Sequence, residues 1–305
     1  MRPIRLILLS MGLLTATLSF AQNQPGVDST GLPGDNFSLQ GALEMFKRAA
    51  SPEEFEKLIN QENNSVNNLD LDGDGETDYV KVIDRSDKEN HVLVLQVDVS
   101  ASESQDIAVI EIEKTGAESA VLQIVGDEDI YGEQVIIEPD GGDDNSFVNP
   151  YSSSNSGPSV SLEQATGHRI VINVWLWPSV RFMYAPVYRP WVSPWRWRHY
   201  PSYWHPWRPF RWNVWHPRCV VYHRPFVVVR THRVVAAHAV YRPVRVTSAT
   251  VRTRNAVTMN NFRVTRTKTT VTGPRGHSAT KTTTKVKGPA GKTRYKSTKV
   301  RTRRH

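Results

Sequence analysis

Three scarcities constrain this chain of 305 residues before any motif is considered. It has a single cysteine, so no disulfide can form within one chain. It has no aspartate or glutamate after Glu163, although it contains 30 of them. It has no tryptophan outside residues 175–215, where all 9 lie. One well-mixed domain would not distribute its residues in this way, so we predict an acidic part joined to a basic part.

The net charge of +8 conceals two opposed halves. Residues 22–163 carry 30 acidic and 7 basic side chains, a net charge of −23, whereas residues 164–305 carry 29 basic side chains and a net charge of +29. The basic half therefore cannot supply a pair of catalytic carboxylates. Sequence motifs of hydrolases, zinc proteases, phosphate-binding loops and dinucleotide folds are also missing. We therefore expect a protein that is not an enzyme.

Only one long apolar run is present, at residues 6–18, and it is shorter than the about 20 residues that a membrane span needs. Arg2 and Arg5 precede it, and small residues at 19 and 21 follow it. This is the layout of a cleaved signal peptide over residues 1–21. We expect export to the periplasm or the outer or extracellular surface of a bacterium, with no transmembrane span after signal removal.

The acidic half predicts an α+β domain over residues 37–139, after a Gly/Pro-rich linker at 22–36. Helical spacing marks residues 37–50, and Ser51-Pro52-Glu53-Glu54 is typical of the start of a second helix. Apolar residues then alternate with polar ones, which predicts strands with one buried face and one wet face. The expected fold is two N-terminal helices on an antiparallel sheet of about five strands, at 79–84, 91–99, 107–113, 120–125 and 134–138.

The sharpest motif of the chain lies between the second helix and the first strand. The run Asp-Leu-Asp-Gly-Asp-Gly-Glu-Thr-Asp places carboxylates on alternate residues of a tight loop, with glycine at its sixth position. Ca²⁺ prefers six to eight oxygen ligands, and such a loop directs oxygens to one point. The candidate calcium ligands are Asp70, Asp72, Asp74, Glu76 and Asp78.

The loop resembles the Asp-x-Asp-x-Asp-Gly loops of dockerins, thrombospondin type 3 repeats and FG-GAP propellers. It departs from an EF-hand because position 12 is Lys81 and a strand pattern follows. The resemblance implies a calcium affinity on the order of 10⁻⁴ to 10⁻³ M. The alternative is a turn rich in Asp and Gly that stays solvated and binds no ion.

The predicted boundary between the two halves is a flexible linker at 140–168, rich in Gly, Ser and Asn, with a short helical turn at 161–168. Residues 169–243 form a basic region rich in Trp, Arg and Pro. We expect strands at 170–177 and 226–235 on either side of an extended segment, because nine prolines between 178 and 225 exclude a long helix.

Interleaved tryptophan and arginine make this region a candidate surface for binding anions. Arginine recognises phosphate and stacks on aromatic rings, and tryptophan prefers the membrane–water boundary. The composition resembles short Trp/Arg/Pro-rich antimicrobial peptides. A nucleic acid would bind by the same chemistry but is less accessible to an exported protein. The alternative is a compact fold in which arginine only solvates the surface. The candidate residues are Arg181, Arg189, Trp191, Trp195, Arg196, Trp197, Arg198, Trp207, Arg208, Arg211 and Trp212.

Residues 244–305 are rich in Thr, Lys and Arg and predict a disordered tail. Cys219 lies among basic residues that would favour its thiolate, and His216 and His223 are close in sequence. A Cys–His catalytic site is therefore one alternative, and an incidental thiol or an intermolecular bridge is the other. The histidines between His199 and His238 have spacings that match no standard metal motif.

As a whole the chain resembles a group of uncharacterised exported bacterial proteins that combine an acidic α+β domain, an Asp-x-Asp-Gly-Asp-Gly loop and a Trp/Arg/Pro-rich basic region. The resemblance implies location and architecture but no activity. We expect a cell-envelope protein that is stabilised by calcium and binds anionic envelope surfaces or polymers. The alternative is a structural protein in which the acidic domain pairs with the basic arm, within one chain or between chains.

Overall fold

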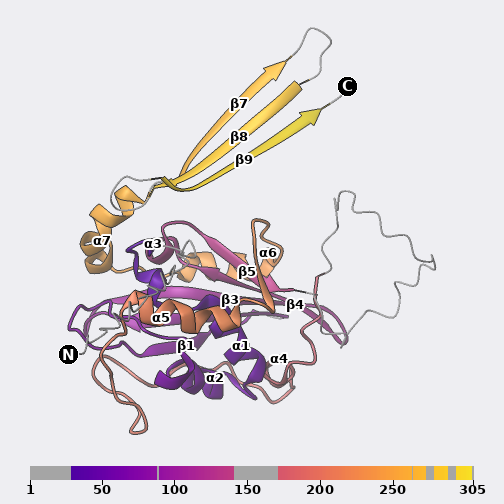
Figure 1. Cartoon of the computed structure of the whole chain (residues 1–305). Coiled ribbons are helices and arrows are strands. Elements are labelled where there is room, and N and C mark those ends of the chain that lie inside the picture. The colour runs from indigo at the N-terminus through magenta and orange to yellow at the C-terminus, as the bar shows by residue number, and fades with distance from the viewer. Residues whose placement is uncertain are drawn as a thin grey trace, which may run out of the picture.

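The computed structural model describes residues 29–87, 89–140, 171–262, 264–272, 278–287 and 293–303. Its centre is a six-stranded antiparallel sheet in the order β1-β2-β3-β4-β5-β6 (Figure 1). Five of these strands come from the acidic half and match the predicted runs: β1 (Val80–Asp84), β2 (Asn90–Asp98), β3 (Ser104–Gly116), β4 (Ser119–Gly126) and β5 (Val135–Pro139). The α+β class is confirmed, and the sheet has one strand more than expected.

The sixth strand, β6 (Phe226–Val229), comes from the basic half and pairs with β5 over four residues. The prediction of a strand over 226–235 is therefore correct only for its first part, since α6 (Val235–Tyr241) begins where the expected strand would end. The sequence signal for β6 is a plain run of valines, which does not reveal its partner.

Two N-terminal helices, α1 (Leu39–Arg48) and α2 (Pro52–Ile59), cover one face of the sheet as expected (Figure 1). Ser38 and Ser51 are their N-caps and accept hydrogen bonds from the third residue beyond, which explains where each helix begins. Phe46 and Phe55 are fully buried and meet edge to face with ring centres 5.3 Å apart.

The second face of the sheet is not wet, which corrects the expectation from the alternating pattern. Val92, Val109 and Glu111 on this face are buried, and Val234 and Ala237 of the basic half pack against it. Figure 1 shows α6 on the side of the sheet opposite α1 and α2. The alternation of polar and apolar residues is present, but a segment more than 100 residues away covers the polar face.

The expected strand at 170–177 is also wrong over its described residues, 171–177, which form no strand. Val174 donates a backbone hydrogen bond to Ala120 of β4 (2.9 Å) and is buried, but Pro178 then starts α4 (Pro178–Met183). Proline at the first helical position directs the chain into a helix instead of continuing an edge strand. Further short helices are α3 (Glu128–Tyr131) and α5 (Trp212–Cys219), with 3-10 turns at Pro33–Asn36, Glu62–Asn64, Val220–Tyr222 and Arg242–Val244.

The expectation of disorder after residue 243 is wrong for residues 245–262. Ser248 is buried and caps the thirteen-residue helix α7 (Ala249–Asn261), whose Val251 is fully buried. The composition of this segment predicts disorder, but its docking against the acidic half supplies the order. The strands β7 (Val264–Thr272), β8 (Ser278–Lys287) and β9 (Thr293–Arg303) form a separate three-stranded antiparallel sheet.

The two halves that charge separates share one hydrophobic core. The largest cluster of buried side chains joins α1, α2 and the sheet to members from the basic half, namely Val174, Val180, Met183, Phe226 and Val251. Residues 141–170, which include most of the predicted linker and its helical turn, lie outside the described residues. The chain on either side of them packs together.

Candidate functional site

Two buried asparagines, Asn60 and Asn67, connect the acidic loop at residues 70–78 to the neighbouring elements through hydrogen bonds. Asn67 donates hydrogen bonds to the backbone oxygen of Asp78 (2.7 Å) and to the side-chain oxygen of Asn60 (3.3 Å). Asn60 in turn accepts from the N–H of Val80 (2.8 Å), the first residue of β1. The loop is therefore fixed between the end of α2 and the start of the sheet.

Within the loop, carboxylates bind backbone N–H groups. Asp70 accepts from Gly73 (2.7 Å) and Gly75 (3.1 Å), and Asp72 accepts from Asp74 (3.0 Å). Both glycines have positive φ angles, 74° and 87°, which other residues adopt only with strain. The motif forms the tight turn that its sequence predicts.

Three of the five predicted calcium ligands come together. Asp70, Asp72 and Asp78 each place one carboxylate oxygen within 4.8 Å of the others, and Asp74 and Glu76 are not part of this group. Asp74 instead accepts the N–H of Glu76 (2.9 Å). The candidate ligand set is therefore smaller than the sequence predicts.

Asp78 is the buried member of the group. Its carboxylate accepts the N–H of Leu71 (2.5 Å). Burial, together with the charges of Asp72 and Asp70, raises the pKa of Asp78 to about 8. Burial and neighbouring acidic groups also raise the pKa of Asp72. Carboxylates with raised pKa values are those that a bound cation would stabilise in their ionised form.

The basic half approaches the loop at two points. Arg254 of α7 donates hydrogen bonds to the backbone oxygens of Leu71 and Asp72, the latter at 2.8 Å. Thr77 donates its N–H (2.8 Å) and its hydroxyl (2.9 Å) to the backbone oxygen of Trp207. The loop thus joins the acidic half to both the aromatic segment and α7. Arg254 is not predictable from the sequence as part of this site, because the Thr, Val and Asn of α7 are weak helix formers.

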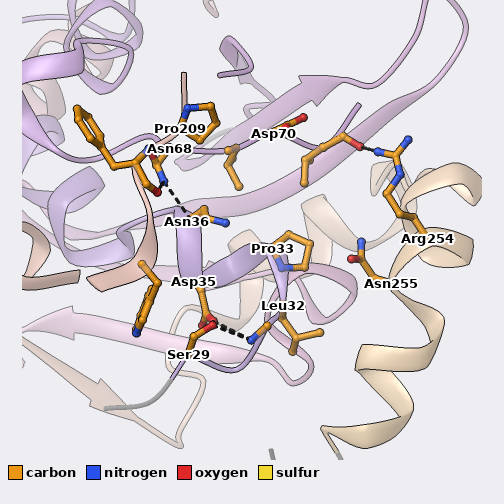
Figure 2. Close-up of a pocket in the computed structure, with 15 residues that line it drawn as sticks. Ser29, Leu32, Pro33, Asp35, Asn36, Asn68, Asp70, Pro209, Arg254 and Asn255 are labelled. Carbon is orange, nitrogen blue, oxygen red and sulfur yellow. Dashed lines mark hydrogen bonds between the residues drawn. The ribbon is translucent and has the colours of Figure 1, made fainter. Parts of the chain in front are cut away.

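Beside the loop lies a cavity of about 390 Å³, shown in Figure 2. Leu69, Asp70 and Leu71 form part of its wall, and Arg254 and Asn255 project from α7. The other lining residues are Ser29, Gly31, Leu32, Pro33, Asp35, Asn36, Asn68, Pro209, Phe210 and Trp212. Many of its polar groups bond to one another: Asn68 donates to Asn36 (3.1 Å), and Asp35 accepts from Ser29 (2.7 Å). The cavity is therefore polar, and many of its hydrogen-bonding groups already have partners within its wall.

The predicted anion-binding residues separate by type. The six arginines of the set are exposed, whereas the five tryptophans are half-buried. Trp191 donates from its indole N–H to the buried carboxylate of Glu56 (3.2 Å), and Arg198 lies over the Trp197 ring (5.3 Å). Trp191 therefore helps to attach the segment to the acidic half, whereas Trp197 is paired within the segment. The exposed set consists of Arg181, Arg189, Arg196, Arg198, Arg208 and Arg211.

The environment of Cys219 opposes the thiolate that its basic neighbours in sequence favour. Its side chain is 6 % exposed, and its thiol donates to the backbone oxygens of Ser65 (3.4 Å) and Trp215 (3.5 Å). Burial raises the pKa of the Cys219 thiol to about 12. A buried, protonated thiol is a poor nucleophile, so this position gives no support to a Cys–His site.

No helix in the described part of the chain has the length and apolarity that a membrane crossing requires. The sequence matches no known family model, and neither a curated protein nor a solved structure shows significant similarity to it. The site must therefore be interpreted from its own chemistry.

Proposed function

We propose that this protein is a non-enzymatic, exported bacterial envelope protein that binds anionic polymers or membrane surfaces through exposed arginines. The observation that carries this proposal is the exposure of six arginines within residues 181–211 of a half without any carboxylate. Many carboxylates of the acidic half contact other parts of the basic half, so this segment keeps its positive charge at the surface. Arginine binds phosphate and carboxylate groups through two parallel hydrogen bonds.

Co-sedimentation of the protein with anionic and with neutral vesicles tests this role. Binding should require anionic lipid and decline with salt, because interactions of exposed charges are screened. The double substitution Arg208→Gln/Arg211→Gln should weaken binding about 30-fold at low salt, at about 1 kcal/mol for each residue.

The matched control is Lys47→Gln/Arg48→Gln, which removes the same charge from α1 of the acidic half. If the two double variants lose binding equally, net charge and not this segment is responsible. If the wild type does not sediment with anionic vesicles at low salt, the proposed role is wrong.

We further propose that the loop at 70–78 binds Ca²⁺ through Asp70, Asp72 and Asp78. The support is the convergence of three carboxylates with raised pKa values at two of them. Water would complete the shell of six to eight oxygens. Because the loop contacts Trp207 and Arg254, calcium would stabilise the attachment of the basic half to the acidic half.

Calorimetric and thermal titration of the full chain with Ca²⁺ tests the loop. Millimolar Ca²⁺ should raise the unfolding temperature, in keeping with an affinity on the order of 10⁻⁴ to 10⁻³ M. Asp72→Asn should abolish most of this shift, whereas Asp74→Asn should preserve it, because Asp74 lies outside the cluster. Both substitutions keep the oxygen that accepts a backbone N–H. Absence of heat and of a thermal shift in the wild type would show an empty turn.

The second candidate function is structural assembly through pairing of the acidic and basic halves. Ion pairs between the halves favour it, including Arg233 with Glu138 (3.2 Å) and Arg245 with Asp127 (2.6 Å). These contacts lie within one chain, but exchange between chains would use the same partners. Sedimentation equilibrium distinguishes the two: a concentration-independent monomer argues against assembly, and a salt-stable dimer supports exchange.

A further inference from the structure

The second face of the sheet holds a cluster of three side chains that belongs to none of the sites above. Glu111, in the middle of β3, is fully buried. His232 precedes α6, and His238 lies within it. His232 contacts one carboxylate oxygen of Glu111 through Nε2, and His238 contacts the other through Nδ1 (2.6 Å). The two imidazole rings lie with centres 4.2 Å apart.

This arrangement provides metal ligands from two distant parts of the chain. One nitrogen of each histidine and one oxygen of Glu111 lie within 4.8 Å of one another. Two imidazoles and a carboxylate are ligands that zinc and related ions accept, with a fourth position open to water. Glu111 is buried, whereas the side chains of His232 and His238 are 18 % and 22 % exposed, so the cluster opens to solvent on its histidine side.

Neighbouring contacts fix the three ligands in place. Glu113, two residues along β3, accepts the N–H groups of Ala236 (2.6 Å) and Ala237 (3.0 Å) at the start of α6. This bond anchors the helix that carries His238 beside the strand that carries Glu111. Val109 and Val234 belong to the buried apolar cluster on the same face. Ligands on rigid, packed elements lose little freedom when an ion binds.

We propose that Glu111, His232 and His238 bind a divalent transition-metal ion of the zinc class. The ion takes the place of the proton in each contact with Glu111, so the ring nitrogen there offers a lone pair and each neutral ring holds its proton on the other nitrogen. The ion joins β3 of the acidic half to α6 of the basic half. The site is independent of the acidic loop, which offers only oxygen ligands suited to Ca²⁺.

The test is titration of the untagged full chain with Zn²⁺ and with Co²⁺, whose absorption spectrum reports its ligands. We expect one ion per chain, bound also in millimolar Ca²⁺, and a rise in unfolding temperature. His238→Gln should lower the affinity at least about tenfold and change the Co²⁺ spectrum. The control is His216→Gln/His223→Gln, a second histidine pair with rings 6.5 Å apart, which should leave both unchanged.

Two results would overturn the site. One is a wild-type chain that takes up neither ion, and the other is an affinity and spectrum that His238→Gln and the control pair alter equally. If Glu111→Gln fails to fold, the Co²⁺ spectra of the wild type and of His238→Gln still decide the question. The calcium titration of the acidic loop is a separate measurement, so failure of either site leaves the other interpretable.

Discussion

At the scale of single residues, the fold depends on buried carboxylates whose donors come from the other half of the chain. Asp106 accepts the hydroxyl of Tyr241 (3.1 Å) and the N–H of Val246 (2.8 Å). Asp127 accepts two bonds from Arg245 (2.6 Å and 3.0 Å). Burial raises the pKa of both carboxyls, and these donors partly offset that effect. A carboxylate in such a position is stable only while its partner is present.

Arg245→Ala should therefore destabilise the protein strongly. The side chain of Asp127 is 2 % exposed, so removal of Arg245 leaves a buried carboxylate without its cationic partner, at a cost of about 3–5 kcal/mol. The control is Arg252→Ala, because Arg252 is 53 % exposed and bonds Asp129 at the surface, where a pair contributes about 0–1 kcal/mol. Urea denaturation measures both. Asp127→Asn in the Arg245→Ala background should restore part of the loss, and equal losses in the two single variants would contradict the prediction.

Glu56 offers a test of pH dependence. It is 1 % exposed, and its two oxygens accept from Tyr79 and Ser193 (3.0 Å each), Val82 (2.8 Å) and Trp191 (3.2 Å). Burial raises the pKa of Glu56 above its usual 4.5, despite these hydrogen bonds. A raised folded-state pKa means that the contribution of Glu56 to stability is complete below about pH 4.5 and is lost as the pH rises through the folded value.

Comparison with Glu56→Gln isolates this contribution, because glutamine does not titrate. Its NH₂ can face the hydroxyls of Tyr79 and Ser193, which are able to accept, so the variant should fold. The free energy of unfolding of the wild type minus that of the variant should fall as the pH rises above 4.5, the usual pKa of the Glu56 carboxyl, over the range in which the protein stays folded. Urea denaturation across this range measures the difference. A difference that rises with pH would show that the four donors, and not burial, determine the pKa.

At the scale of elements, local sequence signals predict the helices and strands of the acidic half. The helical spacing of residues 37–50, the capping Ser51 of α2 and the alternating pattern of β3 locate these elements within a few residues. Apart from β6, the elements of the basic half are not predictable from their own sequence pattern, because packing against the acidic half orders them. The pattern of residues 171–177 predicts a strand, but the segment forms none and is followed by α4 from Pro178. Helix α7 forms although its sequence lacks a strong apolar face. Packing against the acidic half decides both outcomes.

The candidate sites follow the same division. The acidic loop was predictable because its ligands are adjacent in sequence, whereas Arg254 comes from a helix that composition argues against. The cluster of Glu111, His232 and His238 could not be found from histidine spacing, since its carboxylate lies more than 100 residues from either ring. Only the pairing of the second sheet face with α6 brings them together.

Helix α7 should become less stable when its cap is removed. Ser248 accepts the N–H of Val251 (3.2 Å) and donates to Glu103 (2.8 Å), so it both starts the helix and attaches it to the acidic half. Ser248→Ala should cost about 1 kcal/mol or more and accelerate amide hydrogen exchange across residues 249–261. The control is Thr253→Ala, at an exposed position of the same helix. Rapid exchange of this segment in the wild type would show that it is not docked.

At the scale of the whole molecule, the two oppositely charged halves form ion pairs with each other within one chain. Arg233, Arg245 and Arg252 form ion pairs with carboxylates of the acidic half, and His232 and His238 contact Glu111. The sequence predicts an acidic half and a basic half that are joined only by a flexible linker. The structure instead joins them by a continuous sheet and a common core, with charge pairs around both. The attachment should therefore not depend on electrostatics alone.

Cleavage of the connection between the halves tests this conclusion. A specific protease site placed within residues 141–170 would leave one fragment ending after β5 and another carrying β6, which pairs with it through Ile136–Val229, Ile137–Val228, Glu138–Val227 and Pro139–Phe226. At about 1 M salt the screening length is about 3 Å, which removes attraction between exposed charges. Apolar burial is not weakened by salt. The cleaved fragments should therefore co-elute in size-exclusion chromatography at high salt and separate only in urea.

Separation at high salt alone would mean that charge holds the halves together. The basic half would then be free to exchange its acidic partner for an anionic surface, whereas persistence of the complex leaves the exposed arginines as the part of the basic half that can bind one.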